Sequence, residues 1–323
     1  MTTFKEIRGT AIQVVSSDPS NPEIGQIWYN SSSGTLKGYV ALAAGWSSGG
    51  NINTSRYIAG GAGTQTAALM FGGYTGPAVT GATESYNGSS WTSVNSMNSA
   101  RHSPGGAGTQ TAALGFGGYY PGNRNNTESW NGSSWTAVNV MNTARQGLSS
   151  NFCGTQTATL GAGGYAPGFS TAAESWNGSN WTTITSLNTG GNEKGLIGTQ
   201  TAALALGGAN PGRIATTESW NGSAWTTVNS LNTARSSMGN AGTQTAGIAY
   251  GGYSTANTGV TETWNGTSWT TNPNSLATAR QGISSAGNQT SALASGGYSP
   301  AIVNSTEEWT GPGSFATQTL TVS

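Results

Sequence analysis

The side chains that could carry out catalysis are scarce in this chain. It has one histidine (His102), one cysteine (Cys153) and one aspartate (Asp18). A zinc site needs three or four His, Cys or carboxylate ligands brought together, and a Ser-His-Asp triad needs the histidine and the aspartate beside a nucleophile. The sequence shows neither arrangement. We therefore expect a protein that is not an enzyme, with no catalytic residues, no metal and no cofactor.

Eleven of the 22 charged side chains recur at fixed places along the chain. They are Glu84, Glu128, Glu174, Glu218, Glu262 and Glu307, and Arg56, Arg101, Arg145, Arg235 and Arg280. A buried charge is tolerated only when it is paired or hydrogen-bonded. We therefore expect structural roles, in which each glutamate accepts hydrogen bonds or pairs with an arginine between repeats. One repeat has Gly191 in place of the arginine, and we expect Lys194, three residues further on, to take its place there.

These charges belong to a repeat that fills most of the chain. The string GTQTAALMFGG at 63–73 returns five more times, with starts 44 to 46 residues apart, and TESWNGSSWTAVNVMNTAR at 127–145 represents a second recurring string. A period near 45 residues is typical of propeller blades or helical arrays. Gly, Thr, Ser and Asn form helices poorly, and Asn131-Gly132 suits a tight hairpin turn. The repeat therefore predicts an all-β propeller with four short strands per blade.

The order of residues within the repeat resembles the kelch repeat. Its elements appear here as Arg101, Gly117-Gly118, Glu128, Trp130, Trp135, Met141 and Arg145. The match covers residues 46–310. The resemblance implies a β-propeller of kelch-like four-stranded blades.

The number of blades depends on the N-terminal residues. Trp46 precedes Arg56 by ten residues, as Trp91 precedes Arg101, so residues 1–48 fit a divergent first blade. Residues 9–16 form a candidate strand of that blade. Seven blades are favoured on this basis, with six kelch-like repeats in 49–323. The alternative is six blades, with 1–48 as a separate attachment segment.

The segment GQIWYNSSSGTLKGYV at 25–40 supplies a second resemblance. It is similar to a short hairpin found in bacteriophage tail-fibre and other virion proteins. The resemblance implies a phage structural protein located on the particle surface or tail, with other virion proteins as partners. Homo-oligomers are compatible with this interpretation.

The loops that follow the Gly-Gly pairs differ from one repeat to the next, whereas the other turns are nearly constant. Loops on a rigid scaffold commonly carry recognition. The candidate ligand-binding residues on this face are Tyr74, Tyr119, Tyr120, Arg124, Tyr165, Arg213, Tyr253 and Tyr298. Such an aromatic, hydroxyl-rich surface suits neutral glycans or a protein partner. The alternative is that each tyrosine only caps its blade.

The composition narrows the partners further. Only 7% of residues are charged and the net charge is zero, so no basic patch favours nucleic acid. No apolar run approaches the roughly 18 residues of a membrane helix, so we expect no membrane insertion. The leading hypothesis is a virion protein that binds a host-surface glycan or receptor. The alternatives are a purely structural virion component, packed against capsid or tail proteins, and a carbohydrate-active enzyme.

Overall fold

Strands are the only regular elements in residues 12–148, 151–313 and 315–320, the parts of the chain that the computed structural model describes. The chain divides into two compact units. One is Gly45–Trp309, and the other is Met1–Ala44 together with Thr310–Ser323.

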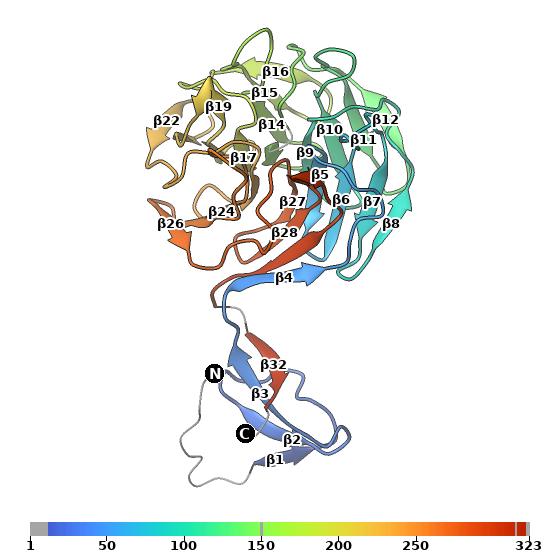
Figure 1. The fold of residues 1–323 in the computed structure, drawn as a ribbon, viewed down its shortest axis with the longest axis vertical. Coiled ribbons are helices and arrows are strands. Elements are labelled where there is room, and N and C mark those ends of the chain that lie inside the picture. Colours follow the sequence, from blue (N-terminus) through green and yellow to red (C-terminus); the bar gives the residue numbers. More distant parts are fainter. Residues whose placement is uncertain (1–11, 149–150, 314, 321–323) are drawn as a thin grey trace. The chain divides into compact units, whose positions relative to one another are not determined.

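The described strands of the larger unit form six groups of four (Figure 1). The first three groups are β5 (Gly60–Thr64), β6 (Ala67–Phe71), β7 (Thr83–Tyr86) and β8 (Trp91–Val94); β9 (Gly105–Gly108), β10 (Ala113–Phe116), β11 (Thr127–Trp130) and β12 (Trp135–Val138); and β13 (Asn151–Cys153), β14 (Thr159–Ala162), β15 (Ala173–Trp176) and β16 (Trp181–Ile184). The other three are β17 (Gly195–Gly198), β18 (Ala203–Leu206), β21 (Thr217–Trp220) and β22 (Trp225–Val228); β23 (Gly239–Gly242), β24 (Gly247–Tyr250), β25 (Thr261–Trp264) and β26 (Trp269–Asn272); and β27 (Ser284–Gly287), β28 (Ser291–Ser295), β31 (Thr306–Thr310) and β4 (Gly45–Gly49). Two small hairpins, β19 (Ala209–Asn210) with β20 (Gly212–Arg213) and β29 (Tyr298–Ser299) with β30 (Ala301–Ile302), lie in the loops.

The groups are arranged in a ring, with the first strand of each near the centre and the fourth at the rim (Figure 1). The second strand of each blade is buried along its length, as Ala113–Phe116 illustrates. Because both faces of this strand are covered, its residues are apolar throughout and do not alternate between apolar and polar. The outer hairpin turns at an Asn-Gly pair, where Asn131 Oδ1 accepts hydrogen bonds from the amides of Ser133 and Ser134. This ring of antiparallel four-stranded blades is a β-propeller.

Two side chains of the repeat bridge each blade to its neighbour. Gln110 Nε2 donates to the carbonyl oxygen of Ala68 in the preceding blade, at 3.1 Å. Trp135 Nε1 donates to Thr83 Oγ1, also in the preceding blade, at 3.0 Å. Gln156 and Trp181 make the same two contacts in the next blade, whereas in the fourth blade Trp225 Nε1 donates to the carbonyl oxygen of Thr185 instead of a threonine hydroxyl. The polar GTQT turn and the tryptophans therefore stabilise the joints between blades.

The hub of the ring is closed by glycine-rich inner strands. β13 pairs in parallel with both β9 and β17, which are the inner strands of the two adjacent blades. A Cβ at Gly106 would overlap the carbonyl oxygen of Gly61, and a Cβ at Gly61 would overlap that of Ser285. The inner strands thus approach backbone to backbone, which only glycine permits.

The smaller unit contains one four-stranded sheet. Its strands are β1 (Gln13–Val15), β2 (Ile27–Asn30), β3 (Thr35–Ala41) and β32 (Phe315–Thr319), in the sheet order β1-β2-β3-β32. Trp28 is buried, and its indole donates to Asp18, which also binds Asn30 and Lys37. Of the strand predicted at 9–16, residues 13–15 form β1, and residues 9–11 lie outside the described residues.

The described chain therefore holds seven four-stranded groups, in line with the predicted number, and they are divided between the two units. Six form the ring, and the sheet of β1, β2, β3 and β32 is the seventh. Trp46 belongs to the ring, because β4 is the fourth strand of the last blade. The N-terminal piece is thus a separate sheet, as in the alternative of six blades plus an N-terminal piece.

Candidate binding face

Five of the predicted tyrosines occupy one equivalent position in five blades. Each directly follows the Gly-Gly pair and forms an antiparallel bridge with the residue that directly follows the repeat arginine or its equivalent. The bridges are Tyr74 with Tyr57, Tyr119 with His102, Tyr165 with Gln146, Tyr253 with Ser236, and Tyr298 with Gln281; in the remaining blade Ala209 pairs with Asn192. The loops after Gly-Gly and the connections between blades therefore meet on one face, which we call the binding face.

The glycines make this meeting possible. Gly117 and Gly118 have φ of +61° and +104°, in the region that favours glycine. A Cβ at Gly118 would lie 2.8 Å from the carbonyl oxygen of His102. The Gly-Gly pair therefore lets Tyr119 lie directly beside His102.

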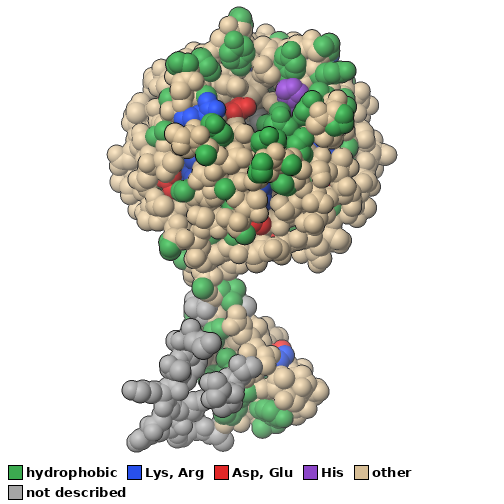
Figure 2. All heavy atoms as spheres, in the orientation of Figure 1, with side chains coloured by type: hydrophobic (Ala, Val, Ile, Leu, Met, Phe, Trp, Pro, Cys, Tyr) green, Lys and Arg blue, Asp and Glu red, His purple; other side chains and the backbone are tan. Residues whose placement is uncertain are grey.

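Five rings form a continuous series on the binding face, which we call the aromatic arc. The ring centroids are 5.7 Å apart for Tyr298 and Tyr57, and 5.9 Å for Tyr57 and Tyr74. The series continues from Tyr74 to His102 at 6.2 Å and from His102 to Tyr119 at 5.2 Å. These distances fall in the range of favourable aromatic pairs. Figure 2 shows the histidine among hydrophobic side chains on this face.

Burial favours the neutral form of two rings of the arc. It lowers the pKa of His102, which favours the uncharged imidazole. It also raises the pKa of Tyr57, with further contributions from Tyr74 and Glu193. The arc thus presents neutral rings whose hydroxyl and imidazole groups can donate or accept hydrogen bonds.

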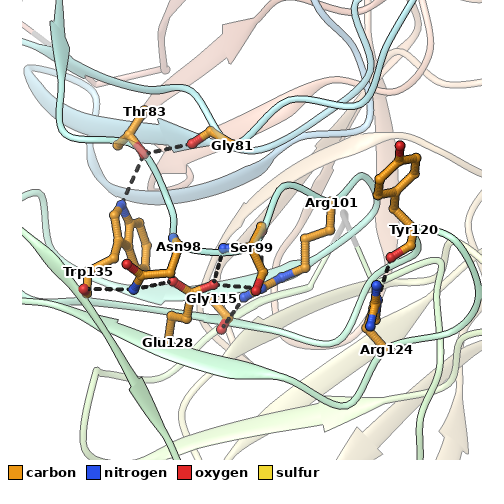
Figure 3. Close-up of polar contacts among 10 residues, drawn as sticks. All are labelled: Gly81, Thr83, Asn98, Ser99, Arg101, Gly115, Tyr120, Arg124, Glu128 and Trp135. Atoms are coloured by element: carbon orange, nitrogen blue, oxygen red, sulfur yellow. Dashed lines mark hydrogen bonds and ion pairs between the residues drawn. The ribbon is translucent and has the colours of Figure 1, made fainter.

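The other candidate residues lie elsewhere on the blades. Tyr165 contacts Phe169 at 5.8 Å, and the Arg213 guanidinium lies 4.8 Å from the centroid of the Tyr253 ring. Arg124 donates to the carbonyl oxygen of Tyr120, whose side chain is half exposed (Figure 3). Within the described residues, no ring contact joins these side chains to the arc.

A small depression adjoins the arc. Its volume is about 140 Å³, and it is lined by Tyr57, Ile58, Glu193, Ser237, Gln281 and Gly282. Tyr57 belongs to both the arc and the depression. Figure 2 shows a hollow on this face with an acidic side chain at its edge. We call this feature the central depression.

The floor of the depression belongs to a ring of backbone hydrogen bonds that crosses the blades. Ile58 N donates to Gly282 O at 2.8 Å, Ser103 N to Ile58 O at 2.7 Å, and Gly282 N to Ser237 O at 2.8 Å. Leu148 N, Glu193 N and Ser237 N continue the series to Ser103 O, Gly147 O and Glu193 O. The ring is thereby closed by one backbone hydrogen bond per blade.

Sequence reasoning missed Tyr57, Glu193, Ser237 and Gln281 as candidate site residues. Each lies one or two residues after a repeat arginine or its equivalent. The sequence does contain a signal for them: the residue types at these positions differ between repeats, although the arginine before them is nearly constant. The same position in the second blade holds His102.

The repeated charges are buried in ion pairs. Arg56 lies 3.0 Å from Glu84, Arg101 2.7 Å from Glu128, Arg145 3.2 Å from Glu174, Arg235 3.1 Å from Glu262, and Arg280 is paired with Glu307. Each glutamate also accepts backbone N–H bonds from the connection between blades, as Asn98 and Ser99 donate to Glu128 (Figure 3). Glu218 receives these bonds from Asn188 and Thr189.

Lys194 is the buried cation of the repeat that lacks the arginine. Burial lowers the pKa of its ammonium group to about 8, and the charge of Glu218 acts in the opposite direction. Lys194 and Glu218 therefore interact where the other blades have an arginine–glutamate pair.

Three findings concern metal binding, thiol chemistry and membrane spans. The described residues contain no group of three or more His, Cys, Asp or Glu side chains placed to hold a metal ion. Cys153 is buried in β13, and burial raises the pKa of its thiol. No helix in the described part of the chain is long and apolar enough to cross a membrane.

The fold and the binding face together define a β-propeller with a loop-built surface on one side. No protein-family model matches the chain, and no curated protein matches it in sequence. The solved structure of YjhT is similar, with a TM-score of 0.67 and 12% sequence identity, over 83% of this chain and 99% of that chain. At this identity the likeness shows the fold alone, and the predicted all-β propeller is confirmed.

Proposed function

We propose that this protein is a non-enzymatic recognition protein of a bacteriophage particle, built as a kelch-repeat propeller, that binds neutral glycans of the host surface. The observation that carries the proposal is the aromatic arc. It presents neutral rings from three blades on loops held by a rigid ring of strands. Aromatic rings offer an apolar face and polar edges, which match the apolar faces and hydroxyl groups of a sugar chain.

The absence of a catalytic role is supported by where the carboxylates lie. Five of the six repeated glutamates are held in buried ion pairs with arginine, and the sixth lies beside Lys194. A retaining glycosidase needs two carboxyl groups about 5 Å apart at its substrate. The repeated glutamates are engaged in joining the blades instead.

The assignment to a phage particle is supported by the smaller unit. Residues 25–40, which resemble a tail-fibre hairpin, include β2 and all of β3 except its last residue, and these two strands form an antiparallel hairpin. In the proposal this unit attaches the protein to other virion proteins at the particle surface or tail. The propeller then carries the glycan-binding face.

A glycan array tests the proposed function. The intact protein is expected to bind a subset of neutral glycans, and binding is expected to persist at physiological salt because no ion pair with the ligand is required. Retention of acidic glycans only, or loss of all binding on adding salt, would contradict a neutral ligand.

A second function, a purely structural virion component, is favoured by apolar side chains of the smaller unit. Val14 and Ile24 are 66% and 68% exposed there. Val14 also pairs in register with Tyr29, which is 39% exposed, and adjoining exposed apolar side chains mark contacts with other proteins. A density map of the intact particle separates the two functions, because a binding face buried against another virion protein would leave no room for a glycan.

A further inference from the structure

The central depression differs from the aromatic arc because it carries a charge. Glu193 is the one charged side chain among the six residues that line it, beside the ring of Tyr57 and the polar side chains of Ser237 and Gln281. Its volume of about 140 Å³ corresponds to four or five water molecules at about 30 Å³ each. The depression therefore accommodates one small group and not a length of glycan.

One oxygen of Glu193 is oriented by the protein. Its Oε2 accepts a hydrogen bond from Ser237 Oγ and a longer one, at 3.4 Å, from Ser236 Oγ. Among the described residues no hydrogen bond is found to its Oε1, so this oxygen can accept one from a ligand. The carboxylate is thus held in place and able to accept a further hydrogen bond.

The backbone beneath the depression is held in an unfavourable conformation. Ile58, Ser103, Glu193 and Ser237 have φ of +48°, +54°, +54° and +53°, whereas Gly147 and Gly282 occupy the equivalent positions of two other blades at +75° and +64°. A left-handed conformation costs a non-glycine residue roughly 1–2 kcal/mol. Glycine would avoid this cost, so the four non-glycine residues lower the stability of the fold, and three of them line the depression. Strained residues of this kind are common at functional sites.

We propose that the central depression binds the terminal sugar of a glycan and selects a sugar that carries no acidic group. Tyr57 contacts the apolar face of the ring, and Glu193 accepts a hydrogen bond from a hydroxyl or ammonium group. A carboxylate on the sugar would place two like charges in one small site, which disfavours the wrong ligand. The aromatic arc, which continues from Tyr57, contacts the next sugars of the chain. The inference rests on the proposed function, because it names the ligand class of the same face.

The test compares two glycans that differ only at their terminus, one ending in galactose and the other capped with sialic acid. The intact protein is expected to bind the galactose-ended glycan at least about tenfold more tightly, because like-charge contacts disfavour the wrong partner. Glu193→Gln is expected to bring the two affinities close together. Glu23→Gln removes an exposed carboxylate of the smaller unit and is expected to leave the ratio unchanged.

Gln281→Ala serves as a second variant that keeps the charge of the depression. It is expected to weaken binding of both glycans while the preference for the neutral terminus remains. Equal binding of both glycans by the intact protein, or an unchanged preference in Glu193→Gln, overturns the inference and leaves glycan binding in place. Failure of the intact protein to bind any glycan overturns both the inference and the proposed function.

Discussion

The indole Nε1 of Trp46 donates a 2.9 Å hydrogen bond to Oγ1 of Thr261, which lies 215 residues further along the chain. The same kind of bond joins Trp91 to Thr306 and Trp135 to Thr83. The last blade takes its fourth strand, β4, from the N-terminal side of the ring. The N-terminal strand that completes the last blade is therefore fastened to the preceding blade by the contact that also joins the internal blades.

Trp46→Phe tests this closure, because it removes the N–H donor while keeping a large aromatic ring. We expect the free energy of unfolding to fall by about 0.5–1.5 kcal/mol, measured by urea unfolding. Trp135→Phe is the matched variant within the ring and should cost a similar amount. A clear loss in Trp135→Phe with no loss in Trp46→Phe would show that β4 does not hold the ring closed.

The buried ion pairs predict a large effect from a single charge removal. Arg101→Met leaves Glu128 buried without its cation, which is expected to cost about 3–5 kcal/mol in thermal or urea unfolding. Arg124→Ala, which removes an arginine from the loop of the same blade, is expected to change stability by less than about 0.5 kcal/mol. Similar losses in the two variants would argue against a special role for the buried pair.

The lowered pKa of Lys194 predicts that its contribution to the stability of the protein increases with pH. Burial lowers the pKa of Lys194 from 10.5 to about 8, so between these values the unfolded chain binds more protons than the folded one. The contribution of this residue to the free energy of unfolding therefore increases as pH rises from about 8 to about 10.5. Tyrosines whose pKa is raised, such as Tyr86, act in the opposite direction above pH 10.

The contribution of Lys194 is isolated by comparison with Lys194→Met. The stability of the intact protein, minus that of the variant, should increase over this pH range in urea unfolding. A difference that stays constant with pH would show that the ammonium group does not titrate in the folded protein.

The blades could be predicted from the sequence because their elements are local. The Asn131-Gly132 turn and the apolar strand Ala113–Phe116 lie within one period of the repeat. The assignment of the N-terminal residues could not be predicted with the same certainty. The pairing of β4 with β31 and of β3 with β32 joins segments more than 250 residues apart, and no short-range pattern records such a pairing.

The binding face was predictable only in part, for a related reason. The position of Tyr74 and Tyr119 after Gly-Gly is visible in each repeat. Their contact with His102, which lies between the two rings, joins two blades and depends on the packing of the ring. Glu193 occurs once, so the period of the repeat carries no signal for it.

Replacing glycine by alanine is expected to destabilise the protein strongly at the glycine-rich hub and only weakly in an open loop. Gly106→Ala places a Cβ against the carbonyl oxygen of Gly61 and is expected to cost at least about 1–3 kcal/mol. Gly168→Ala is the control, because a Cβ there meets no atom within 4 Å. Equal stability of the two variants in thermal unfolding would contradict the close approach of the inner strands.

The affinity of a single arc variant for a glycan tests whether the aromatic arc binds the glycan. The measurement is titration calorimetry of the intact protein, Tyr74→Ala and Tyr165→Ala with the neutral glycan that binds best. Tyr74 lies within the aromatic arc, whereas Tyr165 occupies the equivalent position of another blade outside it. The account predicts that Tyr74→Ala weakens binding by about tenfold or more, since each 1.4 kcal/mol is a factor of ten, while Tyr165→Ala binds like the intact protein. Equal affinities of all three proteins would contradict it.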